Sequence, residues 1–315
     1  MPNTFTVALK EFSDIVKGRR FIVLVIVFGL LLTVAIASVY LTVMQNINIP
    51  GIAMPRGFLG RAAYTLIAMM SYFAPIIGLA LGFDAISGEK EKGTLKIVLA
   101  QPVYRDIVIN GKFLAALLAT SLAILVASIM NISGVVFILG VTPTGEEVTR
   151  LVLFIAFSIL FAMTYYSIAV LLSTVSKRTT QSMIIGVVLW AIFTFVIPII
   201  ASLVAFTVRP IRIGQNIQNM TREEMEQLME EMRSRTVITE AINSFTPNYH
   251  FGRIAQYILN VYTGMAIGPR NPAEVRGISI MEGLTSAWPN ILVLVLVTAI
   301  AFIASYMIFM RQEIR

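Results

Sequence analysis

The sequence contains no cysteine, and its 315 residues include a single histidine, His250. Disulfide bonds and cysteine-ligated metals are therefore excluded. One histidine also excludes a multi-histidine metal site or a histidine relay within this chain. These two absences argue against several classes of metalloprotein and hydrolase.

Charged residues are also scarce, at 13% of the chain against 57% hydrophobic residues. A soluble domain of this size needs more polar surface, so the composition indicates an integral membrane protein. The net charge of +7 is compatible with nucleic-acid binding. The basic residues mostly flank apolar runs, however, which is typical of anchoring in a bilayer. We expect lipids and no nucleic acid among the partners.

The phosphate-binding loop of ATPases is missing as well. The Gly111-Lys112 pair is followed by Phe113 and lacks the upstream glycine of that motif. Neither a Ser/His/Asp arrangement nor a pair of carboxylates can be placed at a common depth. We therefore expect no catalytic residue and no nucleotide bound by this chain itself.

Long apolar runs carry the fold prediction, an all-α membrane protein. An amphipathic helix over Thr4–Lys17 is predicted to lie on the membrane surface, because Phe5, Leu9, Phe12 and Val16 follow a helical spacing. Apolar runs of about 20 residues or more predict spanning helices. The six predicted spans are Phe21–Met44, Ala62–Phe83, Phe113–Val141, Leu151–Ser173, Ser182–Val208 and Asn290–Met310. The third helix is expected to begin earlier, near Asp106.

Both termini are predicted to be cytoplasmic, because every lysine then lies in a cytoplasmic segment. Residues 1–208 hold the surface helix and five spans, with cytoplasmic loops at 84–112 and 174–181. Residues 209–289 form an extracytoplasmic helical region, and residues 290–315 form the sixth span and a cytoplasmic tail. The spans contain no firmly intramembrane charge, and Asp84 follows the second span. This argues against an ion-coupled carrier and against a channel lined by charged rings.

The region 209–289 is predicted to form a small helical cap. Thr221 and Glu224 make a capping box that begins a helix running to about Arg235. Further helical pieces are predicted at Ile238–Phe245 and Phe251–Tyr262, and a capped turn at Ser279 with Glu282. The sulfur ligands that suit Cu(I) are also present here, in Met220, Met225, Met229 and Met232 near His250. Methionines at helical spacing are more often packing residues, so we expect no metal site.

The most polar part of the first half is Glu89–Lys112, between two apolar runs. Leu95, Val98 and Leu99 are helically spaced, and Pro102 interrupts the pattern. One interpretation is a charged loop whose lysines face anionic headgroups. The other is a short helix that docks into a protein partner. The carboxylates of Glu89 and Glu91 favour the second interpretation, because an anionic surface repels them.

The segment FDAISGEKEKGTLKIVLAQPVYRDIVINGK resembles the signature of ABC-2 type transporter permeases, the membrane subunits of type V ABC exporters. The matching positions are Glu89 or Glu91, Gly93-Thr94-Leu95, Pro102, Arg105 and Gly111-Lys112. The loop Ser173–Gln181 and the run Ser244–His250 also resemble family features. Within the family, the chain resembles the branch that contains the permease of nitrous oxide reductase maturation.

This resemblance implies a multi-pass subunit of the cytoplasmic membrane, paired with a second permease as a homodimer. Two separate ATP-binding subunits would hold ATP and Mg²⁺. The implied coupling helix and its flanks comprise Glu89, Glu91, Gly93, Thr94, Leu95, Val98, Leu99, Pro102, Arg105, Gly111 and Lys112. Ser176, Lys177 and Arg178 would form a second contact with the ATPase.

The resemblance further implies that the amphipathic helix connects to the first span, and that the second and fifth spans line the substrate path. It assigns no substrate-binding residue. The function it implies is outward transport of a substrate by the complex. The alternative is a non-transporting scaffold whose extracytoplasmic region is moved mechanically by an ATPase.

Overall fold

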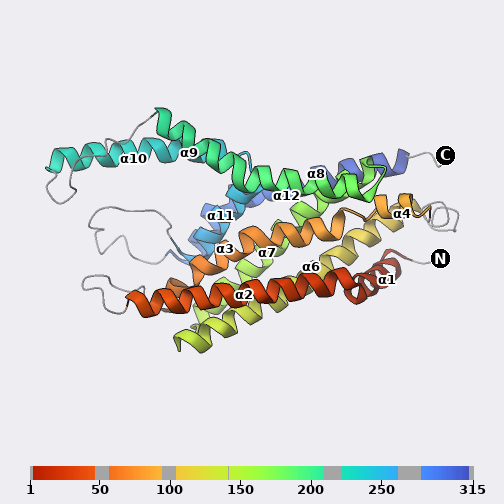
Figure 1. Ribbon diagram of the computed structural model, residues 1–315, viewed down its shortest axis with the longest axis horizontal. Helices are drawn as coiled ribbons and strands as arrows, with labels where there is room; N and C mark the ends of the chain where they lie inside the picture. The colour runs from red at the N-terminus through yellow and green to blue at the C-terminus, as the bar shows by residue number, and fades with distance from the viewer. Residues whose placement is uncertain are drawn as a thin grey trace.

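The computed structural model describes residues 3–46, 57–93, 104–140, 142–208, 221–261 and 278–311, and these residues form helices and their connections. Long helices run side by side along the longest axis of the molecule (Figure 1). Helix α1, helix α4 and the last turns of α12 lie at the same end of this bundle (Figure 1). We refer to it as the α4 end.

The described residues of the first half of the chain form five helices. They are α1 (Thr4–Lys17), α2 (Arg19–Asn46), α3 (Gly57–Gly82), α4 (Ser87–Glu91) and α6 (Arg105–Leu139). The side chain of Asn3 accepts a hydrogen bond from the Thr6 backbone N–H at 2.9 Å and so caps α1. Helix α6 begins at Arg105, which confirms the expected early start of the third long helix.

The second half begins with α7 (Gly145–Val175) and a long helix in three parts. These parts are α8 (Thr179–Ala191), the π-helix η1 (Ile192–Val196) and α9 (Ile197–Val208). Helices α10 (Arg222–Asn243), α11 (Pro247–Leu259) and α12 (Ile280–Arg311) follow. Within the described part of the chain, five helical stretches are long and apolar enough to cross a membrane: Ala63–Glu91, Arg105–Ile138, Gly145–Val175, Thr179–Val208 and Ile280–Arg311. Helix α2, the first predicted span, is not among these five.

Helix α7 is the central helix of the bundle and packs against α3, α6, α8, α11 and α12. Its closest neighbour is α3, which carries the sequence Gly78-Leu-Ala-Leu-Gly82. A methyl group added at Gly78 would lie 2.1 Å from the Ala162 carbonyl oxygen, and one at Gly82 would lie 2.6 Å from the Ala169 Cβ. Two glycines four residues apart therefore bring the two backbones together, as small residues do in membrane helix pairs.

The π-helix η1 has a local cause. Proline at 198 clashes with a regular helical turn at residue 194, because its ring meets the carbonyl four residues earlier. The wider π-turn directly precedes this position. Thr194 within it accepts a hydrogen bond of 3.1 Å from the Asn248 side-chain amide, and Tyr165 donates to the oxygen of the same amide. Thus α7, α11 and the π-turn are joined at one asparagine.

Two helix boundaries in the region 209–289 differ from the prediction. The Thr221–Glu224 capping box is confirmed, but α10 continues to Asn243 instead of ending near Arg235. No glycine or proline interrupts the sequence between these positions, so the predicted break was wrong. Helix α12 begins at Ile280, capped by Ser279 with Glu282, and passes through Pro289.

Helix α11 packs into the core of the bundle. Phe251, Ile254, Ala255 and Ile258 are fully buried and join the cluster formed by α3, α7 and α12. The Phe251 ring stacks on Phe161 of α7 with centroids 4.4 Å apart. The predicted extracytoplasmic location of this segment stays a prediction, and the structure adds that α7 and α12 cover the strongly apolar face of α11.

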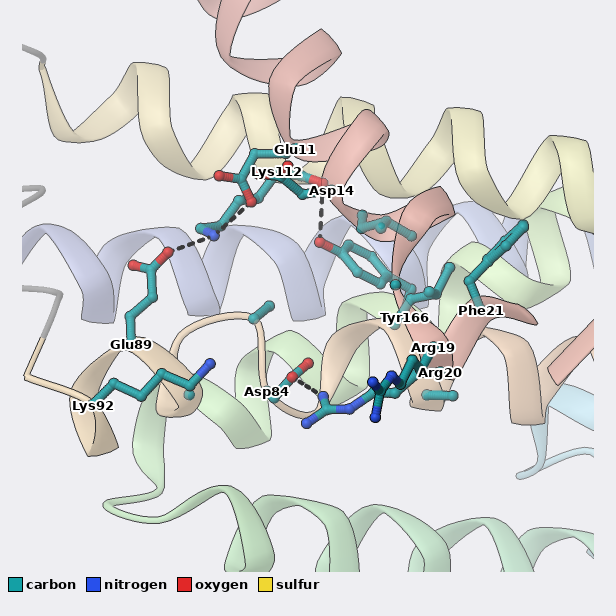
Figure 2. A pocket seen from close by; sticks show the side chains of 16 residues that line it. Glu11, Asp14, Arg19, Arg20, Phe21, Asp84, Glu89, Lys92, Lys112 and Tyr166 are labelled. Carbon is teal, nitrogen blue, oxygen red and sulfur yellow. Dashed lines mark hydrogen bonds and ion pairs between the residues drawn. The ribbon is translucent and has the colours of Figure 1, made fainter. Parts of the chain in front are cut away.

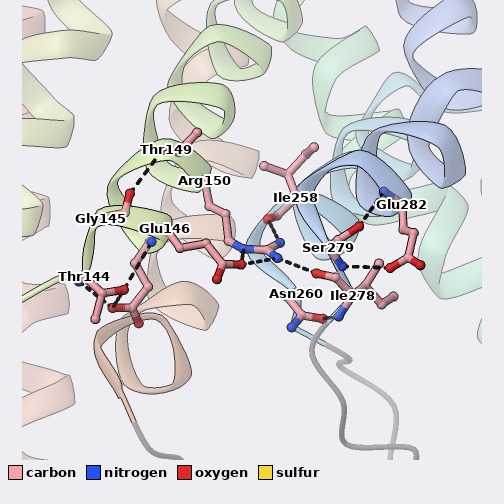
Figure 3. Close-up of polar contacts among 11 residues, drawn as sticks. Thr144, Gly145, Glu146, Thr149, Arg150, Ile258, Asn260, Ile278, Ser279 and Glu282 are labelled. Carbon is pink, nitrogen blue, oxygen red and sulfur yellow. Dashed lines mark hydrogen bonds and ion pairs between the residues drawn. The ribbon is translucent and has the colours of Figure 1, made fainter.

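A buried arginine on α7 holds α11 and α12 in place. The Arg150 side chain is 4% exposed and pairs with Glu146 at 2.8 Å. It donates to the carbonyl of Ile258 at 2.8 Å and also to the carbonyl of Ile278 (Figure 3). The Ile258 carbonyl belongs to the last turn of α11, where the partial negative charge of the helix dipole favours a cation.

We expect Gly78→Ala to lower the stability of the helical bundle by about 1–3 kcal/mol, because the added methyl overpacks the α3–α7 contact. The measurement is thermal unfolding of the purified protein in detergent. Gly252→Ala is the matched control, since no atom lies within 4 Å of its added methyl. Equal unfolding temperatures for the two variants would contradict the close α3–α7 contact.

We expect Arg150→Met to open the α11–α12 junction, at a cost of about 1–3 kcal/mol for two buried carbonyls left without a donor. Hydrogen–deuterium exchange should rise in the last turn of α11 and the first turn of α12. Glu146→Gln is the comparison variant, because the Glu146 side chain is 65% exposed and both carbonyl bonds persist without its charge. Faster exchange throughout the bundle, with no local excess, would argue against this role.

Candidate functional site

The short helix α4 rests on the end of α7. The backbone N–H groups of Ile86 and Ser87 both donate to the Ser173 hydroxyl oxygen, at 3.0 and 2.8 Å. That hydroxyl in turn donates to the Ser87 hydroxyl at 3.0 Å. Since Ser87 and Ser173 are fully buried, these bonds are shielded from water. The start of α4 is therefore fixed to the last turns of α7.

Glu91 connects α4 to the next helix. Its Oε2 accepts a hydrogen bond of 3.0 Å from the backbone N–H of Thr179, the first residue of α8. A carboxylate at this position also interacts favourably with the helix dipole. Lys90 donates to the backbone carbonyl of Thr174, the residue before the end of α7. The described part of the loop 84–112 at α4 and the loop 174–181, predicted as two ATPase contacts, thus lie side by side.

Glu89 is turned in the other direction, toward α6 and α1. Lys112 Nζ lies 2.7 Å from Glu89 Oε1 and 3.0 Å from Glu11 Oε2 (Figure 2). The Lys112 side chain is only 11% exposed, and both carboxylates are largely covered. One lysine on α6 therefore binds α4 and the surface helix α1 together.

Gly111 has a related role, because α1 lies directly against it. A methyl group at Gly111 would lie 2.7 Å from Val7 Cγ1. The Gly111-Lys112 pair of the signature therefore faces α1 and the interior of the described structure. This arrangement could not be predicted from the sequence, because Val7 and Glu11 are remote from the pair along the chain.

Some of the other predicted contact residues lie in the described part of the chain, and the rest lie outside it. Gly93 has a φ of +69°, which a glycine adopts easily, and it follows the end of α4. Arg105 donates to the Met310 carbonyl at 3.2 Å and so joins α6 to the end of α12. Lys177 and Arg178 are exposed, whereas Ser176 is buried. Thr94, Leu95, Val98, Leu99 and Pro102 lie outside the described residues.

The copper alternative meets a chemical obstacle at His250. Its Nδ1 lies 2.8 Å from Asn290 Oδ1 and its Nε2 lies 2.8 Å from the Ser244 carbonyl oxygen. Both ring nitrogens are thus committed to hydrogen bonds, one joining α11 to Asn290 of α12 and the other joining it to Ser244 at the end of α10. In the described part of the chain, no group of three or more His, Asp or Glu residues is arranged to hold a metal ion. Met220 lies outside that part.

The whole chain matches one protein family. Residues 5–314 match the model of the ABC-2 family transporter protein. The chain belongs to the ABC-2 transporter family. It is accordingly a membrane permease, in a family whose membrane subunits are typically non-catalytic and work with ATP-binding subunits.

Two relatives of the permease carry the same description. The probable ABC transporter permease protein NosY of Pseudomonas aeruginosa is 29% identical over 211 residues, which cover 66% of this chain and 72% of the relative. The protein of that description from Stutzerimonas stutzeri is 29% identical over 126 residues, covering 40% of this chain and 43% of the relative. The resemblance noted from the signature is thereby confirmed at the level of the family.

We expect Lys112→Met to destabilise the α4 end by about 1–3 kcal/mol, because two partly buried carboxylates then face each other without a cation. Adding Glu89→Gln to this variant should recover part of the loss, which a double-mutant cycle of unfolding free energies measures. Lys10→Met is the control, since that side chain is 73% exposed and lies 3.9 Å from Glu11. Additive effects of the Lys112 and Glu89 substitutions would contradict a shared cluster.

Proposed function

We propose that this permease is one of two identical membrane subunits of an ATP-driven exporter. Two separate ATP-binding subunits hold ATP and Mg²⁺ and press on the α4 end of each permease. Membership of the ABC-2 family supports the general assignment. The observation that carries the coupling proposal is the hydrogen bond from the Thr179 N–H to Glu91, which makes the two loops one continuous surface.

The exposed residues of this surface favour an acidic groove on the ATPase. Lys177 and Arg178 are both exposed in the loop that directly precedes Thr179, whose backbone N–H donates to Glu91. Tyr104, the residue before α6, is 66% exposed and adds an aromatic side chain. Long-range attraction between unlike charges speeds docking, and aromatic residues are frequent in interface centres.

The topology that we propose has six spans with both termini in the cytoplasm. Helix α2 supplies the first span, because Phe21–Met44 is uncharged and long enough to cross the hydrocarbon core. An even number of crossings also agrees with α1 and the last turns of α12 lying at the same end (Figure 1). This end faces the cytoplasm, where the ATPase binds.

A second permease subunit fits the exposed face of the fifth span. Apolar side chains along α8, η1 and α9 are exposed, among them Ile184, Val188, Phe195, Ile199 and Leu203. The stacked pair Tyr72 and Phe195 joins the second and fifth spans at this face. We propose that these two spans line the path between the two permeases, along which the substrate moves outward.

Force from the ATPase would reach the path as a rigid-body motion. Helix α4 is fixed to α7 through Ser173, and α7 is joined to α12 by the hydroxyl pairs Thr164–Thr298 and Thr174–Ser305, both at 2.8 Å. Closing of the ATP-binding subunits then shifts α3, α4 and α7 together, a two-state change that ATP binding biases.

We expect the double charge reversal Lys177→Glu with Arg178→Glu to weaken binding of the ATP-binding subunit by roughly tenfold, about 1.4 kcal/mol. The measurement is copurification and surface binding of an ATP-binding subunit coexpressed with the permease. Arg222→Glu, on an arginine with 92% side-chain exposure in α10, is the control and should bind normally.

Glu91→Gln provides a second arm of this test. It keeps the exposed cations but weakens the bond to Thr179, so the ATPase should still bind while nucleotide-driven movement of α8 is reduced. Unchanged partner binding in the double reversal would overturn the proposed docking surface. ATP hydrolysis that drives α8 equally well in Glu91→Gln and wild type would overturn the coupling role of Glu91.

A further inference from the structure

The angle between α1 and α2 encloses a pocket that the coupling proposal does not use. Its volume is about 520 Å³, and it lies between α1, the start of α2, the end of α3 and α4 (Figure 2). Acidic and basic side chains line it in equal numbers. A polar pocket of this size accommodates the headgroup of a small amphiphile.

Part of the charge in the pocket is neutralised by the protein itself. Arg20 pairs with Asp84, and Lys112 pairs with Glu11 and Glu89. Three other charged groups remain, namely those of Arg19, Lys92 and Asp14. Among the described residues, none of these three side chains has a hydrogen-bond or ion-pair partner. Two free cations and one free carboxylate match a ligand that carries a phosphate and an ammonium group.

The pocket lies at the polar boundary of the membrane. Arg19 and Arg20 directly precede the uncharged run Phe21–Met44, and Asp84 directly follows the apolar run Ala62–Phe83. The helix next to these residues is the amphipathic α1, a type of helix that lies in the headgroup region. Lipid headgroups are therefore at the depth of the pocket.

An apolar groove begins where the polar pocket ends. Phe21 lines both of them, and the groove continues between α2, α3 and α6 with Phe28 and Ile77 at its floor. The groove encloses only about 10 Å³, so a bound acyl chain would lie along its surface. Val126 and Met130 at its edge are 37% and 47% exposed, and one side of the acyl chain would therefore face the bilayer.

From this arrangement we infer a structural lipid site at the α1–α2 angle, which takes a phospholipid with an amine-bearing zwitterionic headgroup of the phosphoethanolamine type. Arg19 and Lys92 bind the phosphate, and Asp14 binds the ammonium group. One acyl chain passes Phe21 and follows the groove. The bound lipid joins the surface helix to the first span and to α4.

The test uses the purified full-length protein, delipidated and then offered three phospholipids in turn by native mass spectrometry. These have ethanolamine, choline or glycerol headgroups and identical acyl chains. We expect the ethanolamine lipid to be retained most strongly. Arg19→Gln and Asp14→Asn should each lower its occupancy by roughly fivefold to tenfold, because each removes one ionic contact. Lys17→Gln is the control, since Lys17 is an exposed cation on α1 outside the pocket.

Two further experiments distinguish binding of the headgroup from binding of the acyl chain. Soluble phosphoethanolamine should not compete with the lipid at equal concentration, because it cannot use the groove. Val126→Trp should fill the groove and lower lipid retention while the unfolding temperature stays close to that of wild type. Equal competition by phosphoethanolamine would overturn the proposed binding of the acyl chain in the groove.

The headgroup assignment fails if the glycerol lipid is retained as strongly as the ethanolamine lipid, or if Arg19→Gln binds like Lys17→Gln. Copurification of the ATP-binding subunit should be unchanged in Arg19→Gln, since Arg19 lies outside the docking surface. This measurement distinguishes a failure of the lipid site from a failure of the proposed function.

Discussion

Close backbone contact between α3 and α7 is the constraint on which the α4 end depends. Gly78 and Gly82 allow the two helices to approach until a methyl group would collide with Ala162 or Ala169. Helix α3 leads directly into α4, and α7 leads directly into α8. The distance between α3 and α7 therefore influences the distance between α4 and α8. The hydrogen bond of 3.0 Å from the Thr179 N–H to Glu91 lies just beyond the ends of this closely packed pair.

Polar contacts add specificity to this close packing. Lipid chains are as apolar as leucine, so hydrophobicity alone does not fix how membrane helices pair. In this permease the directional contacts are hydroxyl pairs between α7 and α12, the Lys112 cluster at the α4 end and Arg150 beside α11 and α12. They occur near both ends of α7 as well as along it. The central helix thus has a defined rotation about its axis relative to its neighbours.

The sequence predicted the helices well where composition alone decides, because long uncharged runs can form little else in a membrane. Contacts between residues that are remote along the chain could not be predicted from it. Lys112 was predicted to contact an ATPase, which stays a prediction, and in the structure it pairs with Glu11 and Glu89, while Gly111 accommodates Val7. Helix α11 was predicted as part of a small helical cap, and the structure adds that its apolar face is covered by α7 and α12. The glycine pair at 78 and 82 was a signal present in the sequence that would have identified the α3–α7 contact.

The π-turn at Ile192–Val196 changes the direction in which the side chains of the second half of the fifth span point. A regular helix turns by about 100° for each residue, so one residue inserted into a turn rotates everything beyond it by that angle. The side chains of α9 therefore point in directions rotated from those that a regular continuation of α8 would give. The hydrogen bond from Asn248 to Thr194 lies at this π-turn. A homologue with one residue fewer in this turn would direct Ile199 and Leu203 to different surroundings while its apolar composition stayed the same. In such a homologue, a one-residue gap would change which side chains meet the neighbouring subunit.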